Sequence, residues 1–391
     1  MNEFRSVLIY STYFILTAAL GVVFVLLEDL QSRHGLADWE VGLIAGTGFG
    51  AALVVQTVLS PLADRGVKVP LAIAALGSGV AGPLGLAYGS STLVLAGSRG
   101  LSGIGLGLFG LLARKALIGL DAAGGGAKLG MLLSVAVAGF ISGPFIGYLF
   151  EPLGFEAPFL AVSLALIVFG APATMAIVRS ETATAAVDYS VIGQLLRRPR
   201  IQAALLVQCI VLGYVGVFDA IVDRFLTDLG ASTGDVARAI MVVGFPMLIL
   251  PRIAGNKAEA LGGTRVMLPA LLCLVPIMLG YSLVPTALWF SAVGLLHGSA
   301  ESFASISSQV LVLEVTGAEK AAVGTGLLDA AGLISAAVAA GLAPLIYGAS
   351  GRGLFVITTS VGVMLAGLAL WRIRYAAELD RVAAAAPAAP V

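Results

Sequence analysis

Long apolar segments are the feature that most constrains how this chain can fold. Twelve of them approach or exceed the roughly 20 residues that a helix needs to cross a membrane. They cover about residues 7–29, 39–61, 69–89, 92–114, 129–150, 157–178, 201–226, 235–254, 265–284, 287–313, 321–347 and 353–373. Charged residues make up only 11% of the sequence, against roughly 25% in soluble domains. Because lipid offers the backbone no hydrogen bonds, each segment must be helical, and we predict an all-α membrane protein with twelve transmembrane helices.

The second half of the chain repeats features of the first half at an offset of 195 residues. The pairs that this offset relates are Gly21 and Gly216, Glu28 and Asp223, Asp64 and Glu259, and the runs 35–41 and 230–236. A repeat of half the chain indicates two copies of one structural unit. We therefore predict two pseudo-symmetric six-helix bundles, residues 1–178 and 201–374. A cytoplasmic linker (179–200) joins them, and a disordered cytoplasmic tail (375–391) follows.

Basic residues gather in the loops on one side of the predicted membrane region. Cytoplasmic loops carry an excess of Lys and Arg, so both termini and the linker are predicted to be cytoplasmic, in a multi-pass protein of the plasma membrane. The net charge of zero suggests no nucleic-acid partner. Cys209 and Cys273 match no metal-binding spacing, and the sequence lacks the Gly-x-x-x-x-Gly-Lys loop that binds ATP. We therefore predict neither a metal nor a bound cofactor.

Ionisable side chains inside the predicted helices are the strongest functional signal, because a charge at membrane depth is costly. They are Arg99, Asp219, His297, Glu301 and Asp329, with Glu28 and Asp223 nearer the outer surface. With a rise of about 1.5 Å per residue, Arg99 and Asp219 come out at a similar depth. We predict that these groups carry a proton or line a cavity. The structural alternatives are a fixed ion pair for Arg99, solvated helix ends for Glu28 and Asp223, and a capping contact for Asp329.

The run 60–68 resembles the loop signature of the major facilitator superfamily, Gly-x-Leu-Ala-Asp-Arg-x-Gly-Arg-Lys. The residues that fit are Leu62, Ala63, Asp64, Arg65 and Lys68; Ser60 replaces the first glycine, and one residue is missing after Arg65. The resemblance implies the twelve-helix major facilitator fold, in which spans one, four, seven and ten line a central cavity. Nearly all the buried charges lie on those spans. It also implies a cytoplasmic gate made of Asp64, Arg65, Lys68, Glu259 and Arg265.

Two further runs resemble signatures of proton-coupled transporters. Arg99-x-x-x-Gly103-x-Gly105 in the fourth span resembles the signature of proton-coupled facilitators, which implies that the arginine assists proton movement. The fifth span resembles the signature of the drug–proton antiporters in Gly139, Gly143, Pro144 and Gly147, with Tyr148 in place of the last glycine. This resemblance implies a stripe that seals the two halves against proton leak. The alternative is ordinary packing of small residues between helices.

The first span places Tyr10, Tyr13, Thr17 and Phe24 on one helical stripe, which suits an amphiphilic or cationic ligand and equally suits an ordinary helix contact. Together, these features predict a monomeric secondary transporter, not an enzyme. We expect it to export small organic (drug-like or amphiphilic) compounds by alternating access driven by a proton gradient. The alternative is a proton-coupled importer or facilitator of a small metabolite. A membrane enzyme or a non-transporting sensor is a more distant rival.

Overall fold

The computed structural model describes residues 2–59, 67–120, 125–180 and 191–385, and these ranges are helical apart from short connections. The first half of the chain holds α1 (Asn2–Val22), η1 (Val23–Val25), α2 (Leu27–His34), α3 (Asp38–Val54), η2 (Val55–Leu59), α5 (Lys68–Tyr88), α6 (Thr92–Leu120), α7 (Gly125–Phe150), η3 (Glu151–Leu153) and α8 (Ala157–Val178). The second half holds α9 (Ile192–Leu196), α10 (Pro199–Asp228), α11 (Thr233–Leu261), α12 (Gly263–Gly280), η5 (Tyr281–Leu283), α13 (Ala287–Ser350) and α14 (Gly353–Ala385). No β-strand occurs in these ranges, and the predicted all-α fold is confirmed.

Eleven helical stretches in the described ranges are long and apolar enough to cross a membrane. The remaining predicted span, 287–313, forms the first part of α13 and is less apolar, because it carries His297, Glu301 and several serines. Gly317 interrupts α13 with a φ of 66°, which lies in the left-handed region that favours glycine. The two parts of α13 are therefore separate spans, and the predicted twelve-helix architecture is confirmed.

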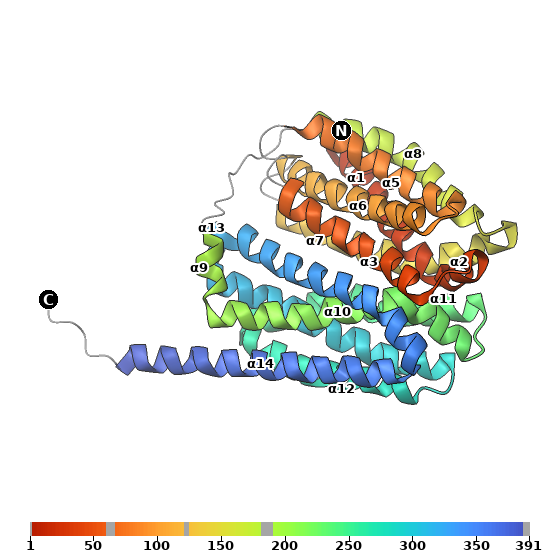
Figure 1. Cartoon of the computed structure of the whole chain (residues 1–391). Helices are drawn as coiled ribbons and strands as arrows, with labels where there is room; N and C mark the ends of the chain where they lie inside the picture. The colour runs from red at the N-terminus through yellow and green to blue at the C-terminus, as the bar shows by residue number, and fades with distance from the viewer. Residues whose placement is uncertain (1, 60–66, 121–124, 181–190, 386–391) are drawn as a thin grey trace.

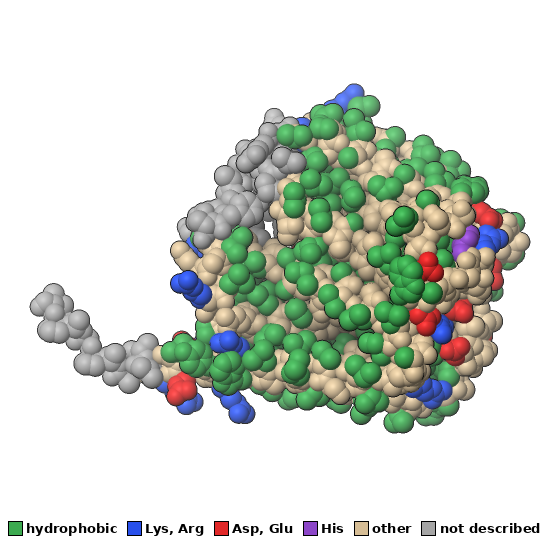
Figure 2. Space-filling view, in the orientation of Figure 1, with side chains coloured by type: hydrophobic (Ala, Val, Ile, Leu, Met, Phe, Trp, Pro, Cys, Tyr) green, Lys and Arg blue, Asp and Glu red, His purple; other side chains and the backbone are tan. Residues whose placement is uncertain are grey.

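The helices form two bundles, with the first half of the chain above the second half in Figure 1. In the N-terminal bundle α1 packs against α7 and α8, and in the C-terminal bundle α10 packs against α13 and α14. We call the end of the molecule with α2 the α2 end, and the opposite end, with α9, the α9 end (Figure 1). Charged side chains gather toward these two ends, and hydrophobic side chains cover the flank between them (Figure 2). This is the distribution that a surrounding lipid bilayer requires.

Local geometry repeats where the sequence repeats. Gly35 follows α2 with a φ of 61°, and Gly230 follows α10 with a φ of 80°. The carboxylates of Glu40 and Asp235 each accept a hydrogen bond from the backbone N–H three residues earlier, at the starts of α3 and α11. An acid in this position satisfies an N–H that the helix itself leaves unpaired. The repeated run therefore encodes a repeated turn into a helix.

The first span differs from the continuous helix predicted over 7–29. The helix α1 ends at Val22, a 3₁₀ turn follows, and Leu26 leaves helical geometry (φ −126°, ψ 4°) before α2 begins. Hydropathy does not reveal this break, because residues 22–27 are all apolar. The broken segment η1 is buried against α7, α10 and α11, so packing across the two bundles accompanies the break.

The predicted disordered tail (375–391) is wrong over its first part, because α14 continues to Ala385. Residues 386–391 lie outside the described ranges. Five of the eleven residues 375–385 are alanine, the strongest helix former, and Asp380 adds an ion pair with Arg200 of α10 at 2.5 Å. Figure 1 shows this end of α14 projecting beyond the other helices. The predicted linker 179–200 likewise contains α9 and the first residues of α10.

The two bundles meet where α3 packs on the second part of α13 and where α7 packs on α11. Glycines make the first contact close: a Cβ atom on Gly42 would overlap the carbonyl of Gly341, and one on Gly46 would lie 2.9 Å from the Ala337 carbonyl oxygen. These glycines lie in the first half of α3, next to α2. The bundles are therefore packed backbone to backbone near the α2 end.

Candidate functional site

A buried ion pair joins the two bundles. Nη2 of Arg99 on α6 lies 2.6 Å from Oδ1 of Asp219 on α10, and the two side chains are 3% and 2% exposed. Nη1 of Arg99 also donates to the Leu20 carbonyl of α1, at 3.3 Å. We call Arg99 and Asp219 the interbundle pair. The two charges that the sequence places at a similar depth are thus in direct contact.

Small residues make room for the arginine. A Cβ atom on Gly48 of α3 would lie 3.2 Å from Nε of Arg99, so the guanidinium lies against bare backbone. One turn after Arg99, Gly103 lies so close to α3 that a Cβ atom on it would overlap the Gly48 carbonyl. A Cβ atom on Gly105 would likewise overlap the backbone of Gly79 on α5. The glycines of the fourth-span run therefore pack α6 within its own bundle, and the arginine reaches the other one.

The interbundle pair does not use all its hydrogen-bonding capacity. Within the described ranges, Nε of Arg99 and Oδ2 of Asp219 have no hydrogen-bond partner. Removing one partner of a buried ion pair leaves an uncompensated charge and typically costs about 3–5 kcal/mol. A proton on Asp219 would remove the attraction and leave the buried Arg99 guanidinium without a counter-charge, so protonation disfavours this contact. The arrangement can therefore respond to protons.

A second set of contacts closes the α2 end. Oδ2 of Asp223 on α10 accepts a hydrogen bond from the backbone N–H of Glu28, at 2.9 Å, and Asp223 is buried. Arg224 forms an ion pair with Asp38 at the start of α3, at 2.6 Å. The first span is broken just before α2, and the helix leaves the N–H groups at the N-terminus of α2 unpaired. Asp223, from the opposite bundle, accepts a hydrogen bond from one of them. It is not a solvated helix end. Asp38 and Arg224 were not predicted as site residues, because each reads as an ordinary charge at a helix end.

Glu28 lies on α2, outside the membrane-spanning segments. Burial raises the pKa of its carboxyl group, and the nearby Arg224 guanidinium opposes this rise. Within the described ranges, Oε2 of Glu28 has no hydrogen-bond partner. Glu28 at the closed α2 end is therefore easier to protonate than an ordinary exposed glutamate.

His297 and Glu301 lie inside the C-terminal bundle. Nδ1 of His297 is 3.1 Å from the Tyr281 hydroxyl, and Nε2 is 3.7 Å from Oε2 of Glu301. The rings that surround the imidazole belong to Tyr214, Phe218 and Tyr281, all from the same bundle. We call Tyr281, His297 and Glu301 the histidine cluster. Among the described residues, no hydrogen bond or ion pair links it to the interbundle pair, so the predicted ionisable residues fall into separate sites.

Asp329, on the second part of α13, faces the N-terminal bundle. Its carboxyl group and the Tyr13 hydroxyl of α1 both interact electrostatically with the Arg114 guanidinium of α6. Arg114 was not predicted as a site residue, because it reads as one of many basic residues at the cytoplasmic ends of the spans. The structure thus places Tyr13 and Asp329 around one arginine.

The rest of the stripe on α1 faces its own bundle. The Tyr10 hydroxyl donates to a backbone carbonyl of α7 at 3.3 Å, and the Thr17 hydroxyl lies against Gly139 of α7. Phe24 is buried and packs edge to face on Phe140 of α7, with ring centroids 4.9 Å apart. These three positions form an ordinary helix contact, the alternative that the sequence left open.

The fifth-span glycines take part in the same contact. Cβ atoms on Gly139 and Gly143 would overlap backbone carbonyls of α1, and one on Gly147 would meet Val25 of η1. Pro144 lies inside α7. Another face of α7, at Ile141, meets Gly244 of α11 across the two bundles. The glycine stripe therefore lies within the N-terminal bundle, and the bulkier side chains of α7 contact the other bundle.

The predicted cytoplasmic gate is described only in part. Asp64 and Arg65 lie outside the described residues. Nζ of Lys68 donates to the Ser180 carbonyl at 2.6 Å, within the N-terminal bundle. Glu259 and Arg265 are exposed, and no ion pair between the two occurs in the described part of the chain. Their role as a gate stays a prediction.

The sequence profile of the Major Facilitator Superfamily matches residues 9–332. A bacterial homolog of the human lysosomal transporter Spinster, solved in an inward-facing and occupied conformation, matches this structure with a TM-score of 0.74 and 13% sequence identity, covering 95% of this chain and 97% of that chain. The inward-facing and unoccupied conformation gives a TM-score of 0.73 at the same identity and coverage. No curated protein sequence matches this chain. At such low identity, the likeness to the solved structures shows a shared fold.

Proposed function

The chain belongs to the Major Facilitator Superfamily of membrane transporters, and on that premise we propose that it exports small organic compounds by proton-coupled alternating access. In this proposal the protein acts as a monomer in the plasma membrane, with both termini and the α9 end in the cytoplasm. The two bundles rock about the substrate, so that the substrate site opens to the cytoplasm and to the outside in turn. The substrates are drug-like or amphiphilic, in line with the fifth-span signature.

The interbundle pair is the observation that carries this proposal. Arg99 and Asp219 come from different bundles, are buried, and lie 2.6 Å apart while the α2 end is closed. Their attraction stabilises the arrangement in which the bundles touch at this level. A proton on Asp219 removes that attraction, so it changes the balance between two arrangements of the bundles.

The resulting cycle moves protons and substrate in opposite directions. With the α2 end closed, Asp219 is ionised against Arg99, and substrate enters from the cytoplasm. Substrate binding then favours opening at the α2 end, which separates the pair. Asp219 takes up a proton from outside and the substrate leaves. When the protonated transporter returns, Arg99 displaces the proton into the cytoplasm. Without substrate, the ionised pair keeps the α2 end closed and limits futile cycling.

Transport in proteoliposomes tests this assignment, with ethidium as a fluorescent probe from a panel of amphiphilic cations. We expect Asp219→Asn to abolish uphill transport driven by a pH gradient and to retain exchange of ethidium across the membrane, because the amide mimics the protonated acid. Asp380→Asn, the same change in an exposed ion pair at the end of α14, is the matched control. Full uphill transport by Asp219→Asn with an unshifted pH profile would show that this carboxylate does not carry the proton.

Two further outcomes of the same assay decide between alternatives. Proton movement opposite to the probe indicates export by antiport, whereas movement in the same direction indicates the importer. Glu301→Gln should leave the pH profile unchanged, because Glu301 lies within one bundle. If Glu301→Gln loses uphill transport and Asp219→Asn keeps it, the histidine cluster carries the proton instead.

A further inference from the structure

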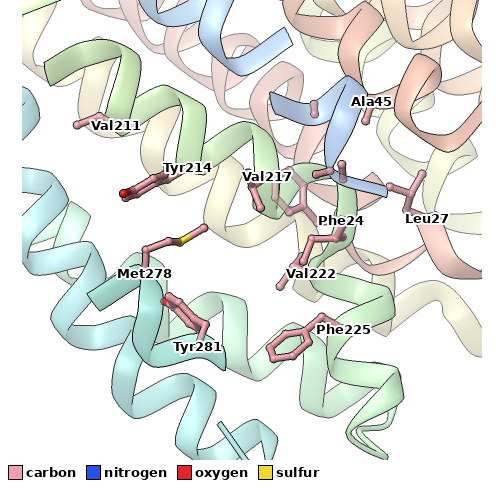
Figure 3. Close-up of a cluster of buried hydrophobic side chains, with 14 of the residues drawn as sticks. Phe24, Leu27, Ala45, Val211, Tyr214, Val217, Val222, Phe225, Met278 and Tyr281 are labelled. Carbon is pink, nitrogen blue, oxygen red and sulfur yellow. The ribbon is translucent and has the colours of Figure 1, made fainter. Parts of the chain in front are cut away.

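Residues 371–381 of α14 carry a stripe of exposed aromatic and apolar side chains. Trp371, Tyr375 and Leu379 are spaced four residues apart and are 53%, 43% and 45% exposed. Side chains at this spacing lie on one face of a helix. The aromatic rings inside the C-terminal bundle differ: Figure 3 shows Tyr214 and Tyr281 among its buried side chains, and they are 3% and 0% exposed. The stripe therefore contacts the surroundings of the protein and not its core.

Arginines border this stripe on both sides. At about 100° per residue around the helix, Arg372 lies next to the stripe on one side, and Arg374 and Arg381 lie on the other. The Arg372 guanidinium is 4.4 Å from the centroid of the Trp371 ring, a cation–π contact that holds the charge beside the stripe. Figure 2 shows basic side chains where α14 leaves the other helices. An exposed apolar face with a basic border is typical of helices that lie against a membrane surface.

Two acids lie among these arginines, and one of them is already paired. Asp380 forms an ion pair with Arg200 at the start of α10. Glu378 lies between Arg374 and Arg381 along the helix. Among the described residues, none of the three arginines that border the stripe forms an ion pair. Three arginines against one unpaired acid leave this surface positively charged.

The position of this surface along α14 matches the level of lipid headgroups. The helix α14 (Gly353–Ala385) has 33 residues, and residues 371–381 lie about 27–42 Å from its start at a rise of about 1.5 Å per residue. A hydrocarbon core is about 30 Å thick, or about 40–45 Å with the headgroups of both leaflets. Figure 1 shows this end of α14 running beyond the neighbouring helices. The stripe and its arginines therefore lie where the hydrocarbon core gives way to headgroups.

We propose that residues 371–381 of α14 bind phospholipids with an anionic headgroup. Trp371 and Tyr375 contact the boundary between acyl chains and headgroups, where their amphipathic rings are favoured. Arg372 and Arg374 contact the phosphate, because a guanidinium presents several N–H donors in one plane. The net charge of the headgroup selects the lipid, since each basic side chain near an anionic surface strengthens the attraction about fivefold. None of these residues belongs to the interbundle pair.

Quenching of tryptophan fluorescence in vesicles tests the site. The chain has three tryptophans, and Trp39→Phe/Trp289→Phe leaves Trp371 as the single one. The probes are brominated phosphatidylglycerol and brominated phosphatidylcholine, each at the same mole fraction in phosphatidylcholine vesicles. We expect the phosphatidylglycerol to quench Trp371 more strongly. Equal quenching by both lipids would mean that this is ordinary lipid-facing surface, and the proposal would be wrong. The measurement needs no transport, so its result does not depend on the proposed function.

Charge variants show whether the arginines select the lipid. Arg372→Gln and Arg374→Gln should each lower the preference for phosphatidylglycerol about fivefold, whereas Arg374→Lys should retain most of it. Glu378→Gln removes the unpaired acid and should raise the preference. The matched control is Arg33→Gln, which changes an exposed arginine that also lies over an aromatic ring, but at the α2 end, and should leave the preference unchanged. Thermal unfolding confirms that each variant is folded. If Arg372→Gln/Arg374→Gln keeps the full preference, these arginines do not select the lipid and the proposal is wrong.

Discussion

The interbundle pair and the histidine cluster are both built from ionisable side chains buried in membrane-spanning helices, yet they connect different parts of the molecule. Arg99 and Asp219 come from different bundles and lie 2.6 Å apart. His297 contacts Tyr281 and Glu301 within one bundle. If the bundles move as rigid bodies, only the first contact changes. Burial of an ionisable group is therefore a weaker guide to alternating access than the elements that the group joins.

The two sites also differ in the kind of interaction that holds them. The interbundle pair is ionic, so removal of one partner leaves a charge in a medium that cannot solvate it. The described contacts of His297 are a hydrogen bond to Tyr281, aromatic rings, and a carboxylate at 3.7 Å. A single hydrogen bond contributes much less, about 0.5–1.5 kcal/mol. Substitutions should therefore affect the two sites to different extents.

The largest effect is expected for Arg99→Leu. This change leaves the Asp219 carboxylate buried without its partner and should lower the free energy of unfolding by about 3–5 kcal/mol. Thermal or denaturant unfolding of the purified protein in detergent measures it. The double variant Arg99→Leu/Asp219→Leu removes both charges and should recover most of the loss. If the two single effects simply add, the side chains do not act as a pair.

A smaller effect is expected for Tyr281→Phe, which removes the hydrogen bond to His297. Stability should fall by about 0.5–1.5 kcal/mol, and the pH profile of transport should not move, because both residues belong to one bundle. Tyr375→Phe, at a half-exposed position on α14, is the control for loss of a tyrosine hydroxyl. A shift of the pH profile as large as that of Asp219→Asn would remove the distinction between the two sites.

The smallest effect is expected at the α2 end, from Glu28→Gln. Burial raises the pKa of Glu28, so the closed end binds a proton more readily than an open, solvated end. This contribution is complete below the ordinary glutamate pKa of about 4.3 and is lost as the pH rises through the raised pKa. Glutamine stays neutral, so the variant should lose this pH dependence. The effect is small because solvent screens a half-buried group.

Distances between spin labels on Ser32→Cys and Thr227→Cys, in a chain without Cys209 and Cys273, report on that opening. The control is Glu156→Gln. Hydrogen bonding from Arg33 lowers the pKa of Glu156, but both residues belong to the N-terminal bundle, so the label distance should keep the pH dependence of the parent chain. If Glu28→Gln also keeps it, Glu28 does not couple closure to pH.

Much of the fold could be predicted because it rests on patterns that are local in the sequence. Hydropathy over about 20 residues locates a span. The repeat is visible in the left-handed glycines, Gly35 and Gly230, and in the capping acids that follow them, Glu40 and Asp235. The break after Val22 could not be predicted in this way. The N-terminus of α2 is satisfied by Asp223, which is 195 residues away, and the segment between is uniformly apolar.

By itself, the sequence determined that this is a helical membrane protein with an internal repeat, and that Arg99 and Asp219 lie at a similar depth. It did not determine which buried side chains meet. Depth depends on position along one helix, whereas the rotation of a helix about its axis depends on all its neighbours at once. Packing turned Thr17 and Phe24 toward α7 and His297 into its own bundle. Only the tertiary structure decided that Arg99 bridges the bundles, because the bare backbone at Gly48 and Gly103 brings α6 close to α3 and leaves the guanidinium room to reach α10.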